Sequence, residues 1–267
     1  MSSIFTSPVL TLEELRQVYV VLTSKNCNQR CRQCYMDFPM SKQGKDFLDI
    51  NKVKELLADI RKEKVEMINL TGAEPMLHPS FNSILRMCLK RTNVCICTNA
   101  SLINEKKARF FRKVEDEGNF SLFFRLSFSH YEEQKNDYAR YRGSFRQSIF
   151  AIKNLEKYGF PVVIELVNYY GEDETVLRKG FLELFSQYEI SPEVFIHSCF
   201  SQDEENDYNN KPKDCMFSRT LSSSGVYSCP YLANDYRGRM GANFKDYSKM
   251  MKAETSYCMS CSACLVE

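Results

Sequence analysis

The sequence predicts an α/β protein in which strands and helices alternate to build one parallel sheet. Three observations lead to this fold class: short β-branched and apolar runs recur along the first 200 residues, segments with apolar residues at helical spacing follow them, and the connections are short. Such alternation is typical of right-handed β-α units. A chain of 267 residues is long enough for one large or two small domains.

The expected elements alternate along the chain, with a helix after each of the first five of six strands. Each expected strand is a short apolar run, at residues 17–23, 65–71, 94–97, 122–127, 161–167 and 194–196. Amphipathic stripes predict helices at residues 51–64, 80–91, 105–117, 144–158 and 174–188. Ligand sites in parallel sheets lie at the C-terminal ends of the strands, so the residues just after each strand are the first candidates for chemistry.

Three cysteines follow the first expected strand closely. Cys27, Cys31 and Cys34 are separated by gaps of three and two residues. These gaps let three thiolates reach three corners of one iron–sulfur cube, which normally takes four, so one iron would stay open to a substrate or cofactor. Unrelated buried thiols are one alternative. A zinc site is another, but zinc normally needs four ligands, and the nearest histidine in sequence is His78.

This spacing resembles the cluster motif of the radical S-adenosylmethionine (radical SAM) enzymes. In that family the open iron binds the amino and carboxylate groups of SAM, and an electron from the cluster cleaves SAM to a 5′-deoxyadenosyl radical that abstracts hydrogen from substrate. The resemblance implies a partial (β/α)6 barrel, a [4Fe–4S] cluster, SAM, and an external one-electron reductant of flavodoxin or ferredoxin type. The family often has an aromatic residue where this chain has Gln33; Tyr35, shortly after, is the expected cofactor contact.

The segment after the second strand, residues 71–75, resembles the family's Gly-Gly-Glu-Pro motif. The resemblance implies that Gly72 lets the backbone come close, that Ala73 replaces the second glycine, and that Glu74 pairs with the SAM ammonium. The alternative is an ordinary strand-end turn with a solvated glutamate.

The next two strand ends supply further expected cofactor contacts. Asn99 lies in a segment that resembles the family's Thr-Asn-Gly/Ala lining of the cofactor pocket. Ser127 and Ser129 stand where the family often has Ser-x-Asp to hold the ribose hydroxyls. Cys95 and Cys97 alternate along the third strand, and we interpret them as small core residues.

Residues 141–145 resemble the family's Arg-Gly-x-Gly-Ser-Phe region. Arg142 is therefore the expected partner of the SAM carboxylate, since a guanidinium pairs with it bidentately, and Arg140 is the alternative. Asn168, at the end of the fifth strand, is an expected adenine contact.

Two residues are candidates for acid–base chemistry. Glu165 lies inside an apolar run, so it is either buried and paired or faces a polar barrel lumen. His130 follows the fourth strand and could shuttle a proton, with a surface loop as the alternative. His197 is a further candidate at the sixth strand.

The C-terminal part, residues 201–267, begins with an acidic run and then holds five cysteines, at Cys215, Cys229, Cys258, Cys261 and Cys264. Residues 225–228 predict a turn and a short strand, hence a hairpin. This layout resembles the auxiliary-cluster domains called SPASM, or twitch in their shorter form. The resemblance implies an auxiliary [4Fe–4S] cluster on Cys215, Cys229, Cys258 and one or both of Cys261 and Cys264. A structural zinc is the alternative. Residues 1–200 would form the barrel.

A second cluster could accept the second electron of a substrate oxidation, whereas a thiol that returns hydrogen would give epimerisation. Cys264 or Cys199 could be that thiol. About sixteen residues precede the first strand, so we expect no leader-binding domain and a small-molecule substrate such as a sugar, cyclitol or nucleoside-type metabolite. The alternatives are modification of a ribosomal peptide, by thioether crosslinking or epimerisation, and a non-catalytic iron–sulfur or zinc protein.

The bulk composition excludes several partners. A net charge of +2 gives no electrostatic case for nucleic acid or a membrane surface. The sequence has no apolar run long enough to span a bilayer and no signal pattern at its start, so we expect a cytoplasmic protein. Twelve cysteines there indicate thiols and metal sites more than disulfides.

Overall fold

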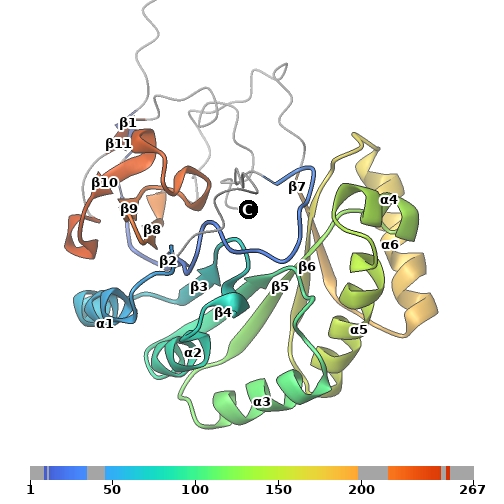
Figure 1. Cartoon of the computed structure of the whole chain (residues 1–267), viewed down its shortest axis with the longest axis horizontal. Coiled ribbons are helices and arrows are strands. Elements are labelled where there is room, and N and C mark those ends of the chain that lie inside the picture. Colours follow the sequence, from blue (N-terminus) through green and yellow to red (C-terminus); the bar gives the residue numbers. More distant parts are fainter. Residues whose placement is uncertain (1–8, 11, 35–45, 198–215, 248–250, 253–267) are drawn as a thin grey trace, which may run out of the picture.

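A curved sheet forms the frame of the chain (Figure 1). The computed structural model describes residues 9–10, 12–34, 46–197, 216–247 and 251–252. The strands of this sheet are β2 (Gln17–Val21), β3 (Met67–Thr71), β4 (Asn93–Thr98), β5 (Leu122–Phe128), β6 (Val162–Val167), β7 (Glu193–His197), β8 (Ser218–Ser222), β9 (Gly225–Tyr227) and β10 (Arg239–Gly241). Their order across the sheet is β10-β9-β8-β2-β3-β4-β5-β6-β7.

The central strands β2 to β7 run parallel and lie side by side in chain order, which confirms the predicted parallel α/β sheet. Their register lines up one apolar row across the sheet, with Val20 opposite Leu70, then Ile96, Phe124 and Val162. All five side chains belong to the buried core. Because side chains alternate along a strand, the intervening residues point to the other face of the sheet.

Six α-helices of the described chain line the outer, convex face of the sheet (Figure 1). They are α1 (Ile50–Asp59), α2 (Phe81–Leu89), α3 (Glu105–Asp116), α4 (Glu133–Ala139), α5 (Ser144–Lys157) and α6 (Glu174–Tyr188). Five of them match predicted helices. The short helix α4 was not predicted, because its sequence has no apolar stripe.

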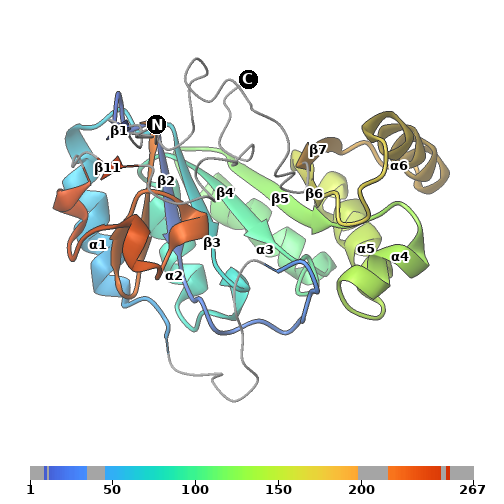
Figure 2. The ribbon, with the colours of Figure 1, turned by 90° about the horizontal axis from the view of Figure 1, so that it is seen from above.

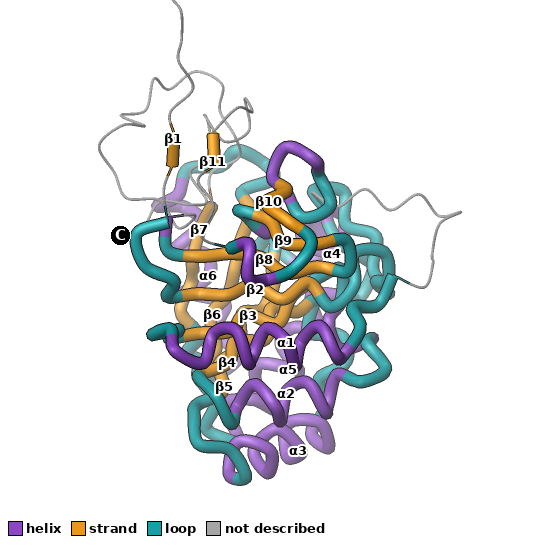
Figure 3. Tube along the Cα trace, turned by 90° about the vertical axis from the view of Figure 1, so that its left-hand side faces the viewer, coloured by secondary structure: helices purple, strands orange, loops and turns teal. Residues whose placement is uncertain are grey.

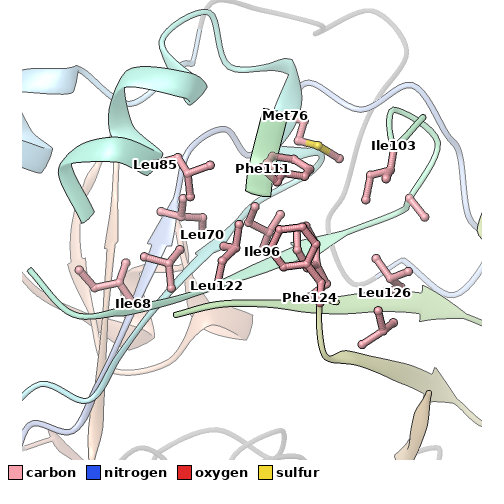
Figure 4. Packing of buried hydrophobic residues seen from close by; sticks show 14 of the residues in the cluster. Ile68, Leu70, Met76, Leu85, Ile96, Ile103, Phe111, Leu122, Phe124 and Leu126 are labelled. Atoms are coloured by element: carbon pink, nitrogen blue, oxygen red, sulfur yellow. The ribbon is translucent and has the colours of Figure 1, made fainter. Parts of the chain in front are cut away.

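The core fills the layer between these helices and the sheet. Phe111 of α3 lies against Phe124 of β5 with ring centroids 5.1 Å apart, and Leu85 of α2 lies over the β3 residues Ile68 and Leu70 (Figure 4). Burying a side chain of this size stabilises the fold by about 1.5–3 kcal/mol. The apolar faces of the helices therefore hold them on the outer face of the sheet and leave its inner face to other contacts.

The C-terminal region continues the same sheet. Strand β8 pairs parallel with β2, with Gln17 opposite Ser218, and it forms an antiparallel hairpin with β9. The hairpin predicted around Gly225 is confirmed. The side chains of Leu221, Val226 and Phe244 join the main core, so β8 and β9 are packed as an extension of the barrel sheet.

A second, two-stranded sheet lies apart from the main one. Strands β1 (Val9–Leu10) and β11 (Met251–Lys252) pair antiparallel and lie beyond β10, at one end of the molecule (Figure 3). None of the helices in the described ranges is long and apolar enough to cross a membrane.

Candidate active site

The segment after β2, residues 23–34, carries Cys27, Cys31 and Cys34 and is called the cysteine loop below. It leaves the C-terminal end of β2 and runs across the sheet towards α4 (Figure 2). Its start is fixed by the carboxylate of Asp46, which accepts hydrogen bonds from Thr23 Oγ1 at 2.8 Å and Asn26 Nδ2 at 2.9 Å.

The far end of the cysteine loop is fixed to α4 and to the end of β5. The backbone N–H of Arg32 donates to the carbonyl of Ala139 at 2.8 Å, and the Arg32 guanidinium lies 4.3 Å from the centre of the Tyr138 ring. The amide Nε2 of Gln33 donates to Ser129 Oγ. Contacts at both ends thus hold the three thiols across the C-terminal ends of the parallel strands.

Cys27 and Cys31 are half-buried, and Cys34 is exposed. The Cys27 sulfur accepts from the Gln29 N–H at 3.4 Å and lies 3.6 Å from Asn99 Nδ2. Burial raises the pKa of Cys27, with the nearby Glu74 and Cys31 acting in the same direction. A bound cation would reverse this, because it stabilises the thiolate that ligates it.

Three thiols on one short loop are the donor chemistry that the spacing predicts for an iron–sulfur cluster. In the described ranges no three Cys, His, Asp or Glu side chains, these thiols included, are already arranged to hold one metal ion. Within the part of the chain that the structure describes, the buried atoms Gln29 Nε2, Gln33 Oε1 and Arg140 Nε beside the loop have no hydrogen-bond partner. Buried polar groups are normally paired, so these atoms indicate that a polar ligand belongs beside the loop.

The turn after β3 packs directly on the cysteine loop. Gly72 has φ +143°, and a Cβ built there would lie 2.4 Å from the carbonyl oxygen of Thr23. The backbone N–H of Ala73 donates to the carbonyl of Thr23 at 2.7 Å, and the N–H of Glu74 donates to the carbonyl of Asn26 at 3.0 Å. Gly72 thus permits close approach of the backbone to the cysteine loop, and its expected approach to SAM stays a prediction. Ala73 keeps negative φ, so it fits where the resemblance expected glycine.

Glu74 is 0% exposed and holds three strand-end segments together. Its carboxylate accepts from Thr98 Oγ1 and the Asn99 N–H, each at 2.9 Å, and from the Met76 N–H at 3.1 Å. Burial raises its pKa against these hydrogen bonds and the nearby Arg140 charge. Glu74 is therefore a buried carboxylate that links the ends of neighbouring strands by hydrogen bonds. The alternative of an ordinary turn with a solvated glutamate is wrong.

Asn99, fixed by Glu74, reaches the cysteine loop. Its Nδ2 donates to Asn28 Oδ1 at 2.9 Å, while its Oδ1 accepts from the Ser101 hydroxyl at 2.6 Å. The expected cofactor contact Asn99 thus lies beside Cys27. Ser127, on β5, is half-buried, and Ser129 is buried against Gln33. The structure therefore brings Asn99, Ser127 and Ser129 to the same strand ends as the loop.

The two arginines considered as partners of the SAM carboxylate differ in burial and in contacts. Arg142 is exposed, whereas Arg140 is 5% exposed and donates from Nη2 to Gln29 Oε1 at 3.1 Å. Which of the two pairs with the SAM carboxylate stays a prediction, but the structure brings Arg140, the alternative, and not Arg142 to the cysteine loop. The reason is that α4, which the sequence did not predict, ends at Arg140 and turns it inward.

Asn168 and His130 form hydrogen bonds within the loops next to them. Asn168 donates from Nδ2 to the Glu172 carbonyl at 2.7 Å and accepts from the Glu172 N–H at 3.1 Å. His130 is 0% exposed; its Nδ1 accepts from the Glu132 N–H at 2.9 Å and its Nε2 lies 3.1 Å from Glu172 Oε1. These contacts argue against adenine binding by Asn168 and proton transfer by His130, and the surface-loop alternative for His130 is wrong.

Of the remaining expected residues, Glu165 and Cys229 lie in the described part of the chain. Glu165 lies on β6, 3.8 Å from Arg125 Nη1 on β5, and faces the inner side of the sheet. Cys229 is buried directly after β9. The other expected residues lie outside the described residues: Tyr35, Cys199, Cys215, Cys258, Cys261 and Cys264, together with the side chain of His197.

Sequence reasoning missed several residues of the site. Asp46 and Gln29 gave no signal, because their roles arise from contacts with the folded loop. Arg125 did give one, a charged residue in the middle of an apolar strand, as Glu165 does on the next strand. Cys95 and Cys97 lie beside Arg125 on the inner face. Cys95 is buried, as predicted for a small core residue, whereas Cys97 is half-buried.

A parallel α/β sheet with a three-thiol loop across its strand ends defines a class of cofactor-dependent enzymes built around an open iron–sulfur site. A model of the radical SAM superfamily matches residues 21–179, more than half of the chain. The chain therefore belongs to the radical SAM superfamily, and the family implies a [4Fe–4S] cluster and SAM as cofactors of an enzyme.

Similar proteins agree with this membership. A GTP 3′,8-cyclase of Chlorobaculum tepidum is 36% identical over 110 residues, covering 39% of this chain and 32% of that protein, so the match spans about a third of the relative's length. A structure of histidine-tagged anSMEcpe with bound AdoMet superposes with a TM-score of 0.65 at 15% identity, covering 87% of this chain and 78% of that chain. Methylornithine synthase (PylB) gives a TM-score of 0.51 at 17% identity, over 69% and 54% of the two chains.

Proposed function

We propose that this radical SAM enzyme binds its [4Fe–4S] cluster through Cys27, Cys31 and Cys34 and abstracts hydrogen from a small-molecule substrate on the inner face of its sheet. The observation that carries this proposal is the cysteine loop, whose contacts at both ends place Cys27, Cys31 and Cys34 on one short segment across the strand ends of the described sheet. When bound, the cluster and SAM supply a 5′-deoxyadenosyl radical.

The residues of the chain would bind and orient the cofactor. Arg140 keeps an unpartnered Nε beside the loop and can pair with the SAM carboxylate through its fork of donors. Gly72 and Ala73 would bring backbone close to the SAM amino group. Asn99, Ser127 and Ser129 offer hydrogen-bonding groups for its adenosine part. The partner that supplies the electron would be an external flavodoxin or ferredoxin.

A small polar molecule suits the inner face. This face carries charged and polar side chains in the middle of its strands, among them Arg125 and Glu165. The partial similarity to an enzyme whose name gives GTP as its substrate supports the nucleoside-type class over the sugar and cyclitol classes. Glu165 would accept a proton if the reaction is an oxidation.

The C-terminal region would hold the auxiliary [4Fe–4S] cluster. Support comes from the β8–β9 hairpin, whose last strand leads to the buried Cys229, as the twitch layout expects. Strand β8 also pairs with β2, which leads into the cysteine loop. Cys215, Cys258 and one or both of Cys261 and Cys264 would complete the ligands. With this cluster as electron acceptor the reaction is an oxidation; with Cys264 as hydrogen donor it is an epimerisation.

Release of 5′-deoxyadenosine tests the proposed function. The reconstituted protein would be mixed anaerobically with SAM and dithionite, and the product measured by chromatography. We expect deoxyadenosine from the wild type and none above background from Cys27→Ala/Cys31→Ala/Cys34→Ala. Cys88→Ala is the matched control, since Cys88 is buried on α2, where burial raises its pKa to about 12 and leaves it inert. Equal release by the triple variant would refute the proposal.

A further inference from the structure

The inner face of the sheet carries an arginine at its centre. Arg125 lies on β5 between Phe124 and Leu126, which are both buried in the core on the helix side. Alternation along the strand therefore turns Arg125 to the inner face. Glu165 on β6 follows the same pattern, because its two neighbours in sequence are also core residues.

The guanidinium of Arg125 has an incomplete set of partners. Its Nη1 lies 3.8 Å from Glu165 Oε1, which is an ion contact beyond hydrogen-bond distance. Among the residues that the structure describes, no side chain or carbonyl accepts a hydrogen bond from any of its five N–H donors. The Arg125 side chain is 33% exposed and that of Glu165 is 25% exposed, so the pair is accessible from the inner face.

The surroundings of Arg125 supply little compensating charge. The other titratable groups that act on it are Cys97, Tyr19 and Cys95. Thiols and phenols are ordinarily neutral at pH 7. Burial lowers the pKa of the guanidinium, whereas the negative charge of Glu165, and those of Cys97, Tyr19 and Cys95 when they are deprotonated, raise it, so Arg125 is a cation at pH 7. Glu165 is thus the one ordinarily charged neighbour among the described residues.

A second observation comes from β8. The hydroxyls of Ser218 and Thr220 are buried and have no hydrogen-bond partner in the described structure. In the register, Thr220 lies beside Tyr19 and Ser218 beside Gln17, on the same inner face. Buried hydroxyls without partners indicate a missing polar ligand. The C-terminal region thus contributes polar groups to this face.

We propose that Arg125 binds an anionic oxygen group of the substrate, a phosphate or a carboxylate, on the inner face of β5. This inference rests on the proposed function and makes its substrate a polyhydroxylated anion in place of a neutral sugar or cyclitol. Arg125 precedes Ser129, at the cofactor end of the strand, by four residues, or about 13 Å of extended chain. A molecule anchored at Arg125 reaches towards the cysteine loop with the carbon that reacts.

Replacing Glu165 should change the affinity for an anion in the direction opposite to replacing Arg125. Its carboxylate lies beside the guanidinium and repels a second anion there. Replacing Glu165 with glutamine removes that repulsion and should strengthen the binding of a simple anion by about 3- to 10-fold. A merely structural Arg125–Glu165 pair would show no such gain.

The experiment is calorimetric titration of the anaerobically reconstituted protein, saturated with SAM and without reductant, so that no turnover occurs. The probes are ribose, ribose 5-phosphate, ribonate and inorganic phosphate. The variants are Arg125→Gln, Glu165→Gln and the control Arg112→Gln. Arg112 is an exposed residue on α3 that pairs with Asp116 at 2.8 Å. Iron content and melting temperature show whether each variant is folded.

We expect an anionic probe to bind the wild type at least 10-fold more tightly than ribose does. We further expect Arg125→Gln to lose about 10- to 100-fold of that affinity, as for a charge-assisted hydrogen-bonded pair, and Arg112→Gln to lose none. Preference for ribose 5-phosphate identifies a phosphate ligand, and preference for ribonate a carboxylate.

Three results would overturn the anion site: equal affinity for ribose and the anions, no binding of any anion at about 10 mM, or unchanged affinity in Arg125→Gln. The proposed function is tested separately by SAM cleavage. A protein that binds the anions but cleaves no SAM would lose the function and keep the site. A protein that cleaves SAM but ignores the anions would lose the site alone.

Discussion

Arg140 Nη2 donates a hydrogen bond of 3.1 Å to Gln29 Oε1, and this contact joins the end of α4 to the cysteine loop. The same Gln29 oxygen lies 3.9 Å from the Cys31 sulfur. A cation is thereby held beside the expected cluster ligands, on residues that are 111 positions apart in the chain. The contact also leaves Arg140 Nε without a partner among the described residues.

We expect Arg140→Gln to weaken SAM binding by about 10- to 100-fold, because it removes a charge-assisted pair with the SAM carboxylate. Equilibrium dialysis against the reconstituted protein measures the dissociation constant. Arg142→Gln is the matched control, since Arg142 is exposed two residues further on, and it should change the constant little. Weaker binding in Arg142→Gln alone would show that Arg142, and not Arg140, pairs with the carboxylate.

Gly72→Ala should destabilise the fold by about 3 kcal/mol or more, since both its positive φ and the close Thr23 oxygen exclude a side chain. Gly171→Ala isolates the backbone term, because Gly171 has φ +65° and no neighbour within 4 Å of an added Cβ. Its cost should be about 1 kcal/mol. Urea unfolding measures both. Equal costs would show that the approach to Thr23 is unimportant.

The contribution of His130 to the stability of the fold should fall as the pH is lowered from about 6.5, the usual pKa of histidine. Burial lowers the pKa of His130, against the raising effect of Glu172, so below 6.5 the unfolded chain takes up a proton that the folded chain binds less readily. His130→Gln should flatten this slope between about pH 7 and pH 5. The lowered pKa of Glu172 acts only at more acidic pH. Identical slopes in urea unfolding would contradict this.

Asp46→Ala should reduce iron incorporation, because Asp46 fixes the start of the cysteine loop through Thr23, Ser24 and Asn26. Asp49→Ala is the control. Asp49 caps α1 by accepting from the Asn51 N–H, so its loss should cost about 1 kcal/mol of stability without affecting iron. Iron is measured after anaerobic reconstitution. Full iron content in Asp46→Ala would mean that the loop is fixed by its other contacts.

The sequence predicted the barrel strands to within two residues, because each is a continuous apolar run that its neighbours bury. Strand β8 was not predicted. Its residues, Ser218–Ser222, are mostly polar, and pairing with β2, about 200 positions earlier, is what makes them a strand. Local periodicity carries no information on such a long-range pair.

The site was predictable where a motif fixes the backbone. Gly72 was found because only glycine fits that approach. The choice between Arg140 and Arg142 was not, since it depends on the end of a helix without an apolar stripe. The contacts of His130 and Asn168 were not predictable for a similar reason, because both bond to Glu172 in a loop whose folding the sequence does not reveal.

The most direct measurement is the iron and sulfide content after anaerobic reconstitution, compared between the wild type and Cys27→Ala/Cys31→Ala/Cys34→Ala. We expect about eight irons per wild-type chain and about four in the variant, one [4Fe–4S] cluster having been lost and the auxiliary cluster kept. About four irons in the wild type and none in the variant would show that the C-terminal region holds no auxiliary cluster. Equal iron in both proteins would contradict a cluster on the cysteine loop.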